Sequence, residues 1–162
     1  MLTNHLHLLS FFAITGEAIP KSKIQKMAYI AKQMGMPLNE RYHFHRNGPY
    51  SEALTVRIEE LCNLHFLEEK REKGSVTYHL TTQGQTFLDQ FHFSPNAFES
   101  LCQRLNHCSN VSLEIMSSIL YFEQRDGHAG NFIERARSIY EERELTDAMN
   151  SLEKQRNVGL FN

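Results

Sequence analysis

Cysteine is scarce in this chain of 162 residues, and its sequence contains no long apolar run. The three cysteines, Cys62, Cys102 and Cys108, are odd in number and include no C-x-x-C pair, which argues against a disulfide framework and for reduced, mostly buried thiols. No apolar run approaches the roughly 20 residues of a membrane span. The apolar stretch at residues 6–14 lacks the basic flank and the cleavage pattern of a signal peptide. We therefore expect a cytoplasmic protein that contacts no membrane.

The sequence also lacks the excess of positive charge that is typical of strong nucleic-acid binders. Its formal net charge is -2 and its pI is near 6.5. Local basic patches can still bind nucleic acid, so DNA stays an alternative partner. The length and the 41% hydrophobic content suit one domain, or a small domain with a helical extension.

Signatures of catalysis and of metal binding are missing as well. There is no G-x-S-x-G motif, no phosphate loop and no dinucleotide-binding fingerprint. Nine histidines are present, but they do not follow the spacing of a zinc site. The loosely spaced candidate ligands are His43 and His45 with His79 or Cys62, and Cys102 and Cys108 with His107. We predict no metal, no cofactor and no enzymatic activity.

Two helices are expected inside the stretch at residues 21–64. Apolar residues at three- and four-residue spacing predict the first helix, which Gly35 ends. Ser51 is placed to cap the second helix, at residues 52–63. A largely buried helix is expected before both of them, ending at Gly16. On the second helix, the residues expected on the core side are Ala53, Val56, Ile58, Leu61 and Leu64.

A sharp turn at Gly48-Pro49 separates these two helices and is expected to end a short strand at residues 41–45. A hairpin with the charged tip 69–74 follows the second helix. Helix, turn, helix and hairpin is the order of a winged helix. We therefore predict a mainly α fold with a small β hairpin, in which the N-terminal domain is winged-helix-like.

The rest of the chain is predicted to be a helical C-terminal extension. A break at residues 94–96 separates the winged-helix-like domain, residues 1–93, from this extension, residues 94–162. The helices expected in the extension cover residues 97–105, 112–124, 131–144 and 146–155. The second of these is apolar nearly all round, so we expect it in the core. The residues that suit a homodimer seam in this region are Ile139, Leu145 and Met149.

Two segments resemble a known family. They are the helix Lys23-Ile24-Gln25-Lys26-Met27-Ala28-Tyr29-Ile30-Ala31 and the turn Gly48-Pro49-Tyr50-Ser51-Glu52-Ala53-Leu54. A K-[LI]-Q-K-[LM]-x-Y-x-A helix paired with a G-P-[YV] turn resembles the YwgA-like family of uncharacterised proteins and, more distantly, the Panacea (SocA-like) antitoxin domain. The resemblance covers roughly residues 5–90. It implies small prophage- or defence-associated proteins that bind another protein, a toxin in the antitoxin case, and it implies no catalytic residues.

Protein binding is the function that the residues themselves favour. The acidic second helix, the Gly-Pro-Tyr turn and the helical tail suit a docking surface, and tyrosine is frequent among interface anchors. The candidate partner-binding residues are Arg46, Asn47, Tyr50, Ser51 and Arg57. Turn chemistry alone also explains the Gly-Pro-Tyr sequence, so Tyr50 is either an interface anchor or a core residue. We expect a module that engages a protein partner in a phage-defence, antitoxin-like or regulatory setting.

A winged-helix regulator that binds DNA is the alternative. Its possible nucleic-acid rim consists of Lys21, Lys26, Lys70, Arg71 and Lys73, with Lys23, Arg41 and Arg46 as further contributors. The helix at residues 52–63 would enter the major groove, but it has three glutamates against the single Arg57. Those carboxylates would meet repulsion from the phosphates. The distribution of charge therefore favours a protein partner over DNA.

Overall fold

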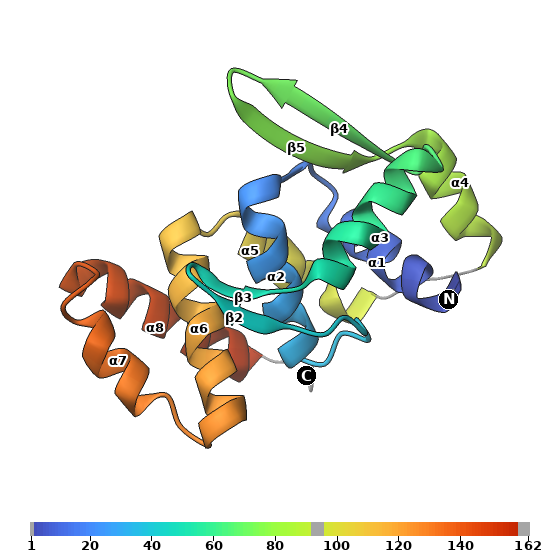
Figure 1. Cartoon of the computed structure of the whole chain (residues 1–162). Coiled ribbons are helices and arrows are strands. Elements are labelled where there is room, and N and C mark those ends of the chain that lie inside the picture. The colour runs from blue at the N-terminus through green and yellow to red at the C-terminus, as the bar shows by residue number, and fades with distance from the viewer. Residues whose placement is uncertain (1, 92–95, 159–162) are drawn as a thin grey trace.

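The computed structural model describes residues 2–91 and 96–158 and is mostly helical, with small antiparallel sheets (Figure 1). The predicted mainly α fold with a small β component is confirmed. The N-terminal elements are α1 (Leu2–Thr15), β1 (Ile19–Pro20), α2 (Lys21–Gln33), β2 (His43–His45), β3 (Gly48–Tyr50), α3 (Glu52–Asn63), β4 (Leu67–Glu72), β5 (Ser75–Leu80) and α4 (Thr82–Gln90). The C-terminal elements are the 3₁₀ turn η1 (Asn96–Phe98), α5 (Glu99–Asn106), α6 (Asn110–Asp126), α7 (Gly130–Ala136) and α8 (Glu142–Val158). Within the described ranges, every helix is too short or too polar to span a membrane.

Local signals set several helix ends where the sequence predicts them. Helix α1 ends directly before Gly16, and α2 ends two residues before Gly35. The hydroxyl oxygen of Ser51 accepts a hydrogen bond from the backbone amide of Leu54 at 3.2 Å, which is the N-cap bond expected for α3. The predicted ends of α1 and α2 and the predicted cap of α3 are confirmed.

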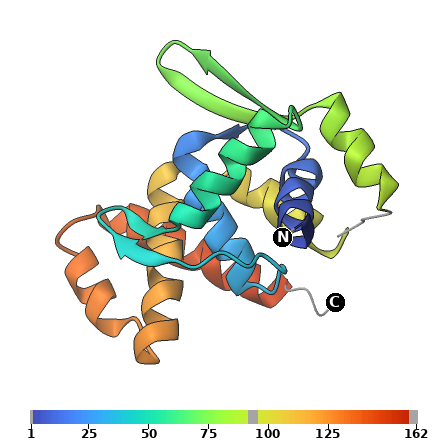
Figure 2. The ribbon, with the colours of Figure 1, turned by 45° about the vertical axis from the view of Figure 1, so that its right-hand side comes forward.

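The predicted hairpin is confirmed as the pair β4 and β5. The strands are joined by Lys73 and Gly74, which both have positive φ angles, of 50° and 79°, as a two-residue hairpin turn requires. On its other side β5 pairs with β1, so the strand order of this sheet is β1-β5-β4. The hairpin projects from the helical body in two views (Figures 1 and 2).

Helix α3 buries only part of the predicted face, since Ile58 and Leu61 are buried as expected but the other three residues are not. The residues of α3 that are buried in the core are Leu54, Ile58 and Leu61. Ala53 is exposed, and Val56 and Leu64 expose 52% and 55% of their surface. Both sets of residues follow the helical period, so periodicity could not choose between them. The contact of α3 with α1 and β4 selects the face that is buried.

The predicted strand does end before Gly48, since β2 ends at His45, but the prediction that Gly48-Pro49 is a turn outside any strand is wrong, because residues Gly48–Tyr50 form β3. This strand pairs with β2, with Phe44 opposite Pro49. Gly48 has a φ of +113°, and a Cβ atom at this position would lie 3.3 Å from the hydroxyl of Ser117 and 3.4 Å from that of Ser118. The β2–β3 hairpin therefore lies directly on α6, where glycine meets two small buried serines.

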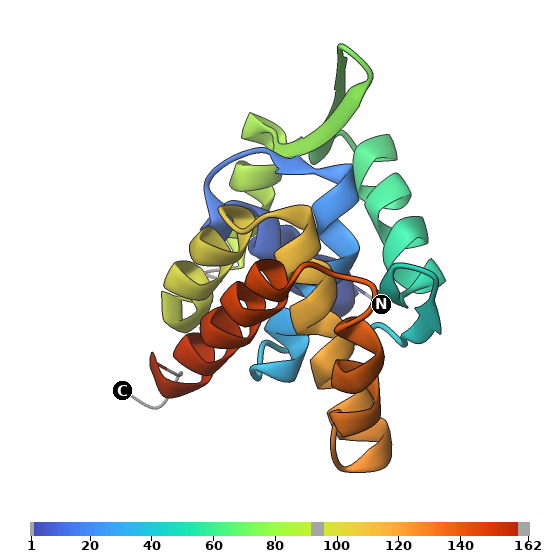
Figure 3. The ribbon, with the colours of Figure 1, turned by 90° about the vertical axis from the view of Figure 1, so that its left-hand side faces the viewer.

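Helix α6 lies between α2 and α8 and is the central element of the core (Figures 1 and 3). Its burial on nearly all sides confirms the prediction from its apolar sequence. The buried apolar residues of α6 are Leu113, Ile115, Met116, Ile119, Leu120 and Phe122. One hydrophobic cluster includes these residues together with residues of α1, α2 and α3. The C-terminal helices are thus packed into the same core as the N-terminal elements.

The C-terminal helices differ from the prediction in two ways. The helix predicted at residues 131–144 ends at Ala136, and the chain turns before α8 begins. In that turn the Tyr140 hydroxyl donates a 2.7 Å hydrogen bond to a carboxylate oxygen of Glu114 on α6, an anchor for which the sequence has no local signal. Leu145 exposes only 2% of its surface because it packs in the core, so the predicted homodimer seam loses that residue. Of the predicted break at residues 94–96, residues 94 and 95 lie outside the described residues.

Gly84 explains the close junction between α4 and the base of the β4–β5 hairpin. The Thr81 hydroxyl caps α4 by accepting a 2.9 Å hydrogen bond from the Gly84 amide. The Thr81 amide donates to the carbonyl oxygen of Phe66 at 3.1 Å. A Cβ atom on Gly84 would lie 2.3 Å from that same oxygen, which is far inside van der Waals contact.

We predict that Gly84→Ala destabilises the protein by about 3 kcal/mol, because backbone must move to remove the clash. The matched control is Gly130→Ala at the start of α7, where the nearest atom to a new Cβ is a histidine side-chain nitrogen at 3.4 Å. This control should change stability by no more than about 1 kcal/mol. Urea denaturation followed by circular dichroism measures both values. Equal stability of the two variants would show that α4 can move away from Phe66.

A buried ion pair joins α3 to the segment before β2. The side chain of Glu40 is fully buried, and one of its oxygens accepts a hydrogen bond from the guanidinium of Arg57, which is 20% exposed. The ammonium of Lys32 donates to the backbone carbonyl of Glu40. Because a buried carboxylate is costly without a partner, Arg57 has a structural role.

We predict that Arg57→Met destabilises the protein by about 3 kcal/mol or more, because it leaves the Glu40 carboxylate buried and unpaired. Adding Glu40→Gln should restore most of that loss, since the amide has no charge to bury. Thermal melts of the single and double variants measure the difference. If Arg57→Met melts like the parent chain, the ion pair is not needed for stability, and Arg57 would be available to bind a partner.

Candidate functional site

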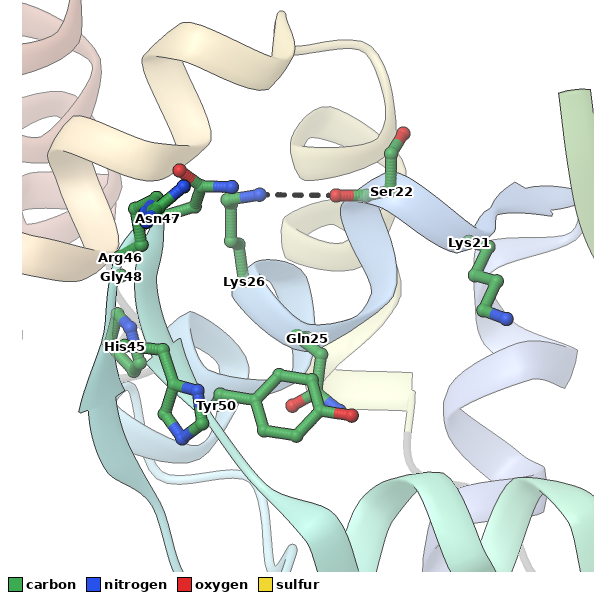
Figure 4. A pocket seen from close by; sticks show the side chains of 10 residues that line it. Lys21, Ser22, Gln25, Lys26, His45, Arg46, Asn47, Gly48 and Tyr50 are labelled. Atoms are coloured by element: carbon green, nitrogen blue, oxygen red, sulfur yellow. Dashed lines mark hydrogen bonds between the residues drawn. The ribbon is translucent and has the colours of Figure 1, made fainter.

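A cleft of about 340 Å³ lies between the first two turns of α2 and the β2–β3 hairpin (Figure 4). We call it the cationic cleft. Its lining residues are Lys21, Ser22, Gln25, Lys26, His45, Arg46, Asn47, Gly48, Pro49 and Tyr50. Three of these are lysine or arginine, and no aspartate or glutamate is among these described lining residues.

The α2 wall of the cleft follows from the way this helix packs. The apolar stripe of α2 is buried, so the residues between its members face outward. Lys21 is exposed and lines the cleft, whereas the ammonium of Lys23 donates to the backbone oxygen of Asn106 at 2.9 Å and does not line it. Across the cleft, Arg46 is exposed at the β2–β3 turn. In the described part of the chain, neither Lys21 nor Arg46 forms an ion pair.

Lys26 is the most enclosed of the three cations. Its ammonium donates a 3.2 Å hydrogen bond to the carbonyl oxygen of Ser22, within the same helix (Figure 4). Burial lowers the pKa of Lys26, and the negative charge of Glu114 partly opposes that effect. Because burial disfavours the ammonium form of Lys26, an anion placed beside it would stabilise that form.

Gln25 joins α2, one wall of the cleft, to the segment that directly follows the other wall. Its side-chain oxygen accepts a 2.8 Å hydrogen bond from the amide of Ser51, and its side-chain nitrogen donates to the carbonyl of Ser51 at 2.9 Å and to the hydroxyl of Thr55 at 3.1 Å. The hydroxyl of Tyr50 lies 3.0 Å from the same Thr55 oxygen. The start of α2 is thereby fixed against the start of α3.

Tyr50 is neither a fully buried core residue nor a free surface residue. It is partly buried, and its ring packs against the ring of His45 with 4.8 Å between their centroids. It therefore forms part of the cleft wall, with its polar end held by Thr55. Tyr50 is thus not a fully buried core residue, and its role as an interface anchor stays a prediction.

The structure brings together only part of the predicted partner-binding set. Arg46, Asn47 and Tyr50 line the cationic cleft. Ser51 is fully buried as the cap of α3, so it is not available to a partner. Arg57 is bonded to Glu40. The position of these last two residues is a correction to the prediction, and it arises because helix capping and ion pairing use their polar groups.

The predicted nucleic-acid rim is divided between two places. Lys21 and Lys26 lie in the cationic cleft, whereas Lys70, Arg71 and Lys73 lie on the β4–β5 hairpin and do not line the cleft (Figure 1). On the hairpin, Arg71 pairs with a neighbouring glutamate, Glu69, at 2.9 Å. The hairpin thus has mixed charge, and the cleft has charge of one sign.

Sequence reasoning missed Gln25, Ser22 and His45 as members of the site. One signal was available, because Gln25 and Lys26 belong to the helix that supports the family resemblance and Tyr50 belongs to its turn. The two motifs face each other across the cleft. A second cavity of about 340 Å³, between α6 and α7, was also missed. Its lining mixes acidic and basic side chains, with Arg125 bonded to Asp126.

The loosely spaced histidine and cysteine candidates do not come together in the described part of the chain. Among residues 2–91 and 96–158, no group of three or more histidine, cysteine, aspartate or glutamate side chains has an arrangement that could hold a metal ion. His43 and His45 are exposed on β2, and His79 pairs with Glu68 at 3.0 Å.

Comparison with known proteins identifies a relative. No model of a protein family matches the chain. The chain is 38% identical over 165 aligned residues to the protein described as "Uncharacterized protein YwgA" of Bacillus subtilis (strain 168), and the alignment covers 98% of this chain and 99% of that protein. The resemblance to the Panacea antitoxin domain stays a prediction. Identity at this level over both full lengths shows that the chain belongs to the YwgA family.

Proposed function

We propose that the protein is a non-enzymatic binding module that holds an acidic segment of a protein partner in the cationic cleft. The observation that supports this proposal most directly is the charge of the cleft. Lys21, Lys26 and Arg46 come from two separate elements and share one cavity, in which none of the described lining residues is acidic. Arginine and a partly buried tyrosine at a concave site are typical of interface anchors. The setting, by the family resemblance, is phage defence, an antitoxin-like complex or regulation.

The arrangement of the N-terminal elements supports a winged-helix-like domain at residues 1–93. Three helices and the three-stranded sheet β1-β5-β4 occur in the order α1, β1, α2, α3, β4, β5. The β2–β3 hairpin is an insertion between α2 and α3, and it forms one wall of the cleft. We propose that residues 94–162 are a helical extension, and that its helix α6 supports this insertion by packing against β3.

A regulator that binds DNA is the second candidate. In a winged helix, α3 would enter the major groove. Its exposed side chains include Glu52, Glu59 and Glu60, while its one arginine is bonded to Glu40. In the described structure α3 therefore has three exposed carboxylates and no unpaired cation. This charge would make docking of α3 on DNA phosphates less favourable. The hairpin residues are what favour DNA, since Lys70, Arg71 and Lys73 are exposed.

Two triple variants separate these candidates, because each removes three positive charges. The cleft variant is Lys21→Gln, Lys26→Gln and Arg46→Gln. The hairpin variant, its matched control, is Lys70→Gln, Arg71→Gln and Lys73→Gln. We expect the cleft variant to weaken binding of the protein partner by about tenfold or more, and the hairpin variant to leave it unchanged.

The measurement is affinity capture from the native host with the parent chain and both variants, with nuclease treatment, followed by titration of the captured partner. Free polyglutamate should compete for the same site. Capture of nucleic acid alone, lost in the hairpin variant and retained in the cleft variant, would instead establish the DNA-binding regulator. Circular dichroism shows that each variant is folded.

The cysteines support the non-enzymatic part of the proposal. Cys102 is buried, and burial raises its pKa to about 12. Burial also raises the pKa of Cys62, with Glu69 and Glu59 adding to the effect, and that of Cys108. A nucleophilic thiol requires the opposite change, because the thiolate is the reactive form.

We predict that all three thiols react with iodoacetamide more slowly in the folded protein than in the denatured chain at about pH 8. The raised pKa values lower the thiolate fraction at this pH, and the fraction rises only as the pH approaches the folded-state pKa. Peptide mass spectrometry of alkylation over time measures each residue separately. A thiol that reacts faster in the folded protein would identify an activated nucleophile and contradict the non-enzymatic proposal.

A further inference from the structure

We infer that the cationic cleft is a phosphate-binding site, which takes a phosphate monoester beside the start of α2 and opposite Arg46. This inference rests on the proposed function in one respect, the use of the same cleft. It adds the chemical class of the group that is bound there.

The charges of the cleft favour a dianion over a single carboxylate. Lys21 and Arg46 form no ion pair among the described residues, and Lys26 is half-buried, with the charge of Glu114 acting on it but no ion pair between the two. A phosphate monoester has a charge of roughly -1.5 to -2 near neutral pH and three acceptor oxygens. Its three oxygens can accept from Lys26 and from Arg46 together, which a carboxylate with two oxygens does less well.

The start of α2 also favours a bound anion. Pro20 is the N-cap residue and makes no side-chain capping bond, and the first turn contains no acidic residue. Lys21 and Lys23 occupy that turn, although the positive end of the helix dipole disfavours cations there. A helix normally begins with an acidic or capping side chain. A bound phosphate would supply the missing negative charge, as anions do at many helix starts.

The donors are placed on two sides of the opening. Figure 4 shows Lys26 beside the β2–β3 turn, where Arg46 and Asn47 lie, with Lys21 five residues earlier on α2 and its side chain pointing away from that turn. Arginine can bind two phosphate oxygens with its planar guanidinium, and the Asn47 amide is a further donor. Gln25 is not available, because its amide is fully used between α2 and α3.

Two kinds of ligand that carry a phosphate monoester fit an open cleft of about 340 Å³. One is a phosphorylated side chain of the partner protein, and the other is a free mononucleotide. Both would present the same phosphate monoester to Lys26 and Arg46.

The test is titration of the full-length protein with inorganic phosphate, followed by amide ¹H–¹⁵N NMR at constant ionic strength. We expect saturable shifts confined to the start of α2 and the β2–β3 turn. Arg46→Gln should weaken phosphate binding by about tenfold, and Lys26→Gln by a similar factor. Lys70→Gln on the hairpin is the matched control and should leave the affinity unchanged. Arg46 is exposed, so its variant stays informative if the half-buried Lys26 variant fails to fold.

Shifts that do not saturate, or an equal loss of affinity in Lys70→Gln, would overturn the inference. Competition by a phosphoserine peptide and by a nucleoside monophosphate then assigns the source, since the tighter competitor is the closer match. Displacement of phosphate by neither would also overturn it. Saturable phosphate binding without capture of any partner would support this inference and contradict the proposed function. Partner binding in the cleft without phosphate binding would do the reverse.

Discussion

The hydrogen bonds of one glutamine side chain hold the site together. Gln25 both donates to and accepts from the backbone of Ser51, and it also donates to Thr55. These bonds join the exposed side of α2 to the first turn of α3 and set the position of Tyr50 just before it. These bonds therefore help to fix the separation of the two walls of the cationic cleft, since Tyr50 belongs to one wall and Gln25 to the other. A rigid cleft matters because donors that are already in place lose less entropy on binding.

Helix α6 fixes the same cleft from the other side. The β2–β3 hairpin can lie on it only because Gly48 meets Ser117 and Ser118, all of which leave room for close approach. Glu114, on the same helix, acts on Lys26 across a separation of 88 residues in the chain, and it also accepts a hydrogen bond from Tyr140. The C-terminal helices are therefore part of the site, although none of their side chains lines the cleft among the described residues.

Charge is segregated on the surface of this protein in a way that the net charge of -2 conceals. Glutamates are exposed on α3, basic residues line the cleft, and the β4–β5 hairpin has both signs. A uniformly basic surface would attract nucleic acid along its whole length. A small basic cleft beside an acidic helix instead favours a ligand that presents a localised negative charge and rejects an extended polyanion.

Local rules acting on the sequence alone determined several elements. Gly16 and Gly35 mark helix ends, Ser51 caps α3, Lys73 and Gly74 form the hairpin turn, and the apolar composition of α6 requires burial. Each of these depends on neighbours within a few residues. The two motifs that carry the family resemblance both line the cleft. The sequence does not indicate that they face each other.

Only the tertiary structure decided which face of α3 is buried, whether Gly48-Pro49 could join a strand, and whether Leu145 packs inside. It also assigned Arg57 to Glu40 and thereby removed Arg57 from the candidate surface. The physical reason is the same in each case. A helical stripe or a charged side chain has several equally good local arrangements, and contacts with residues far away in the chain select one of them.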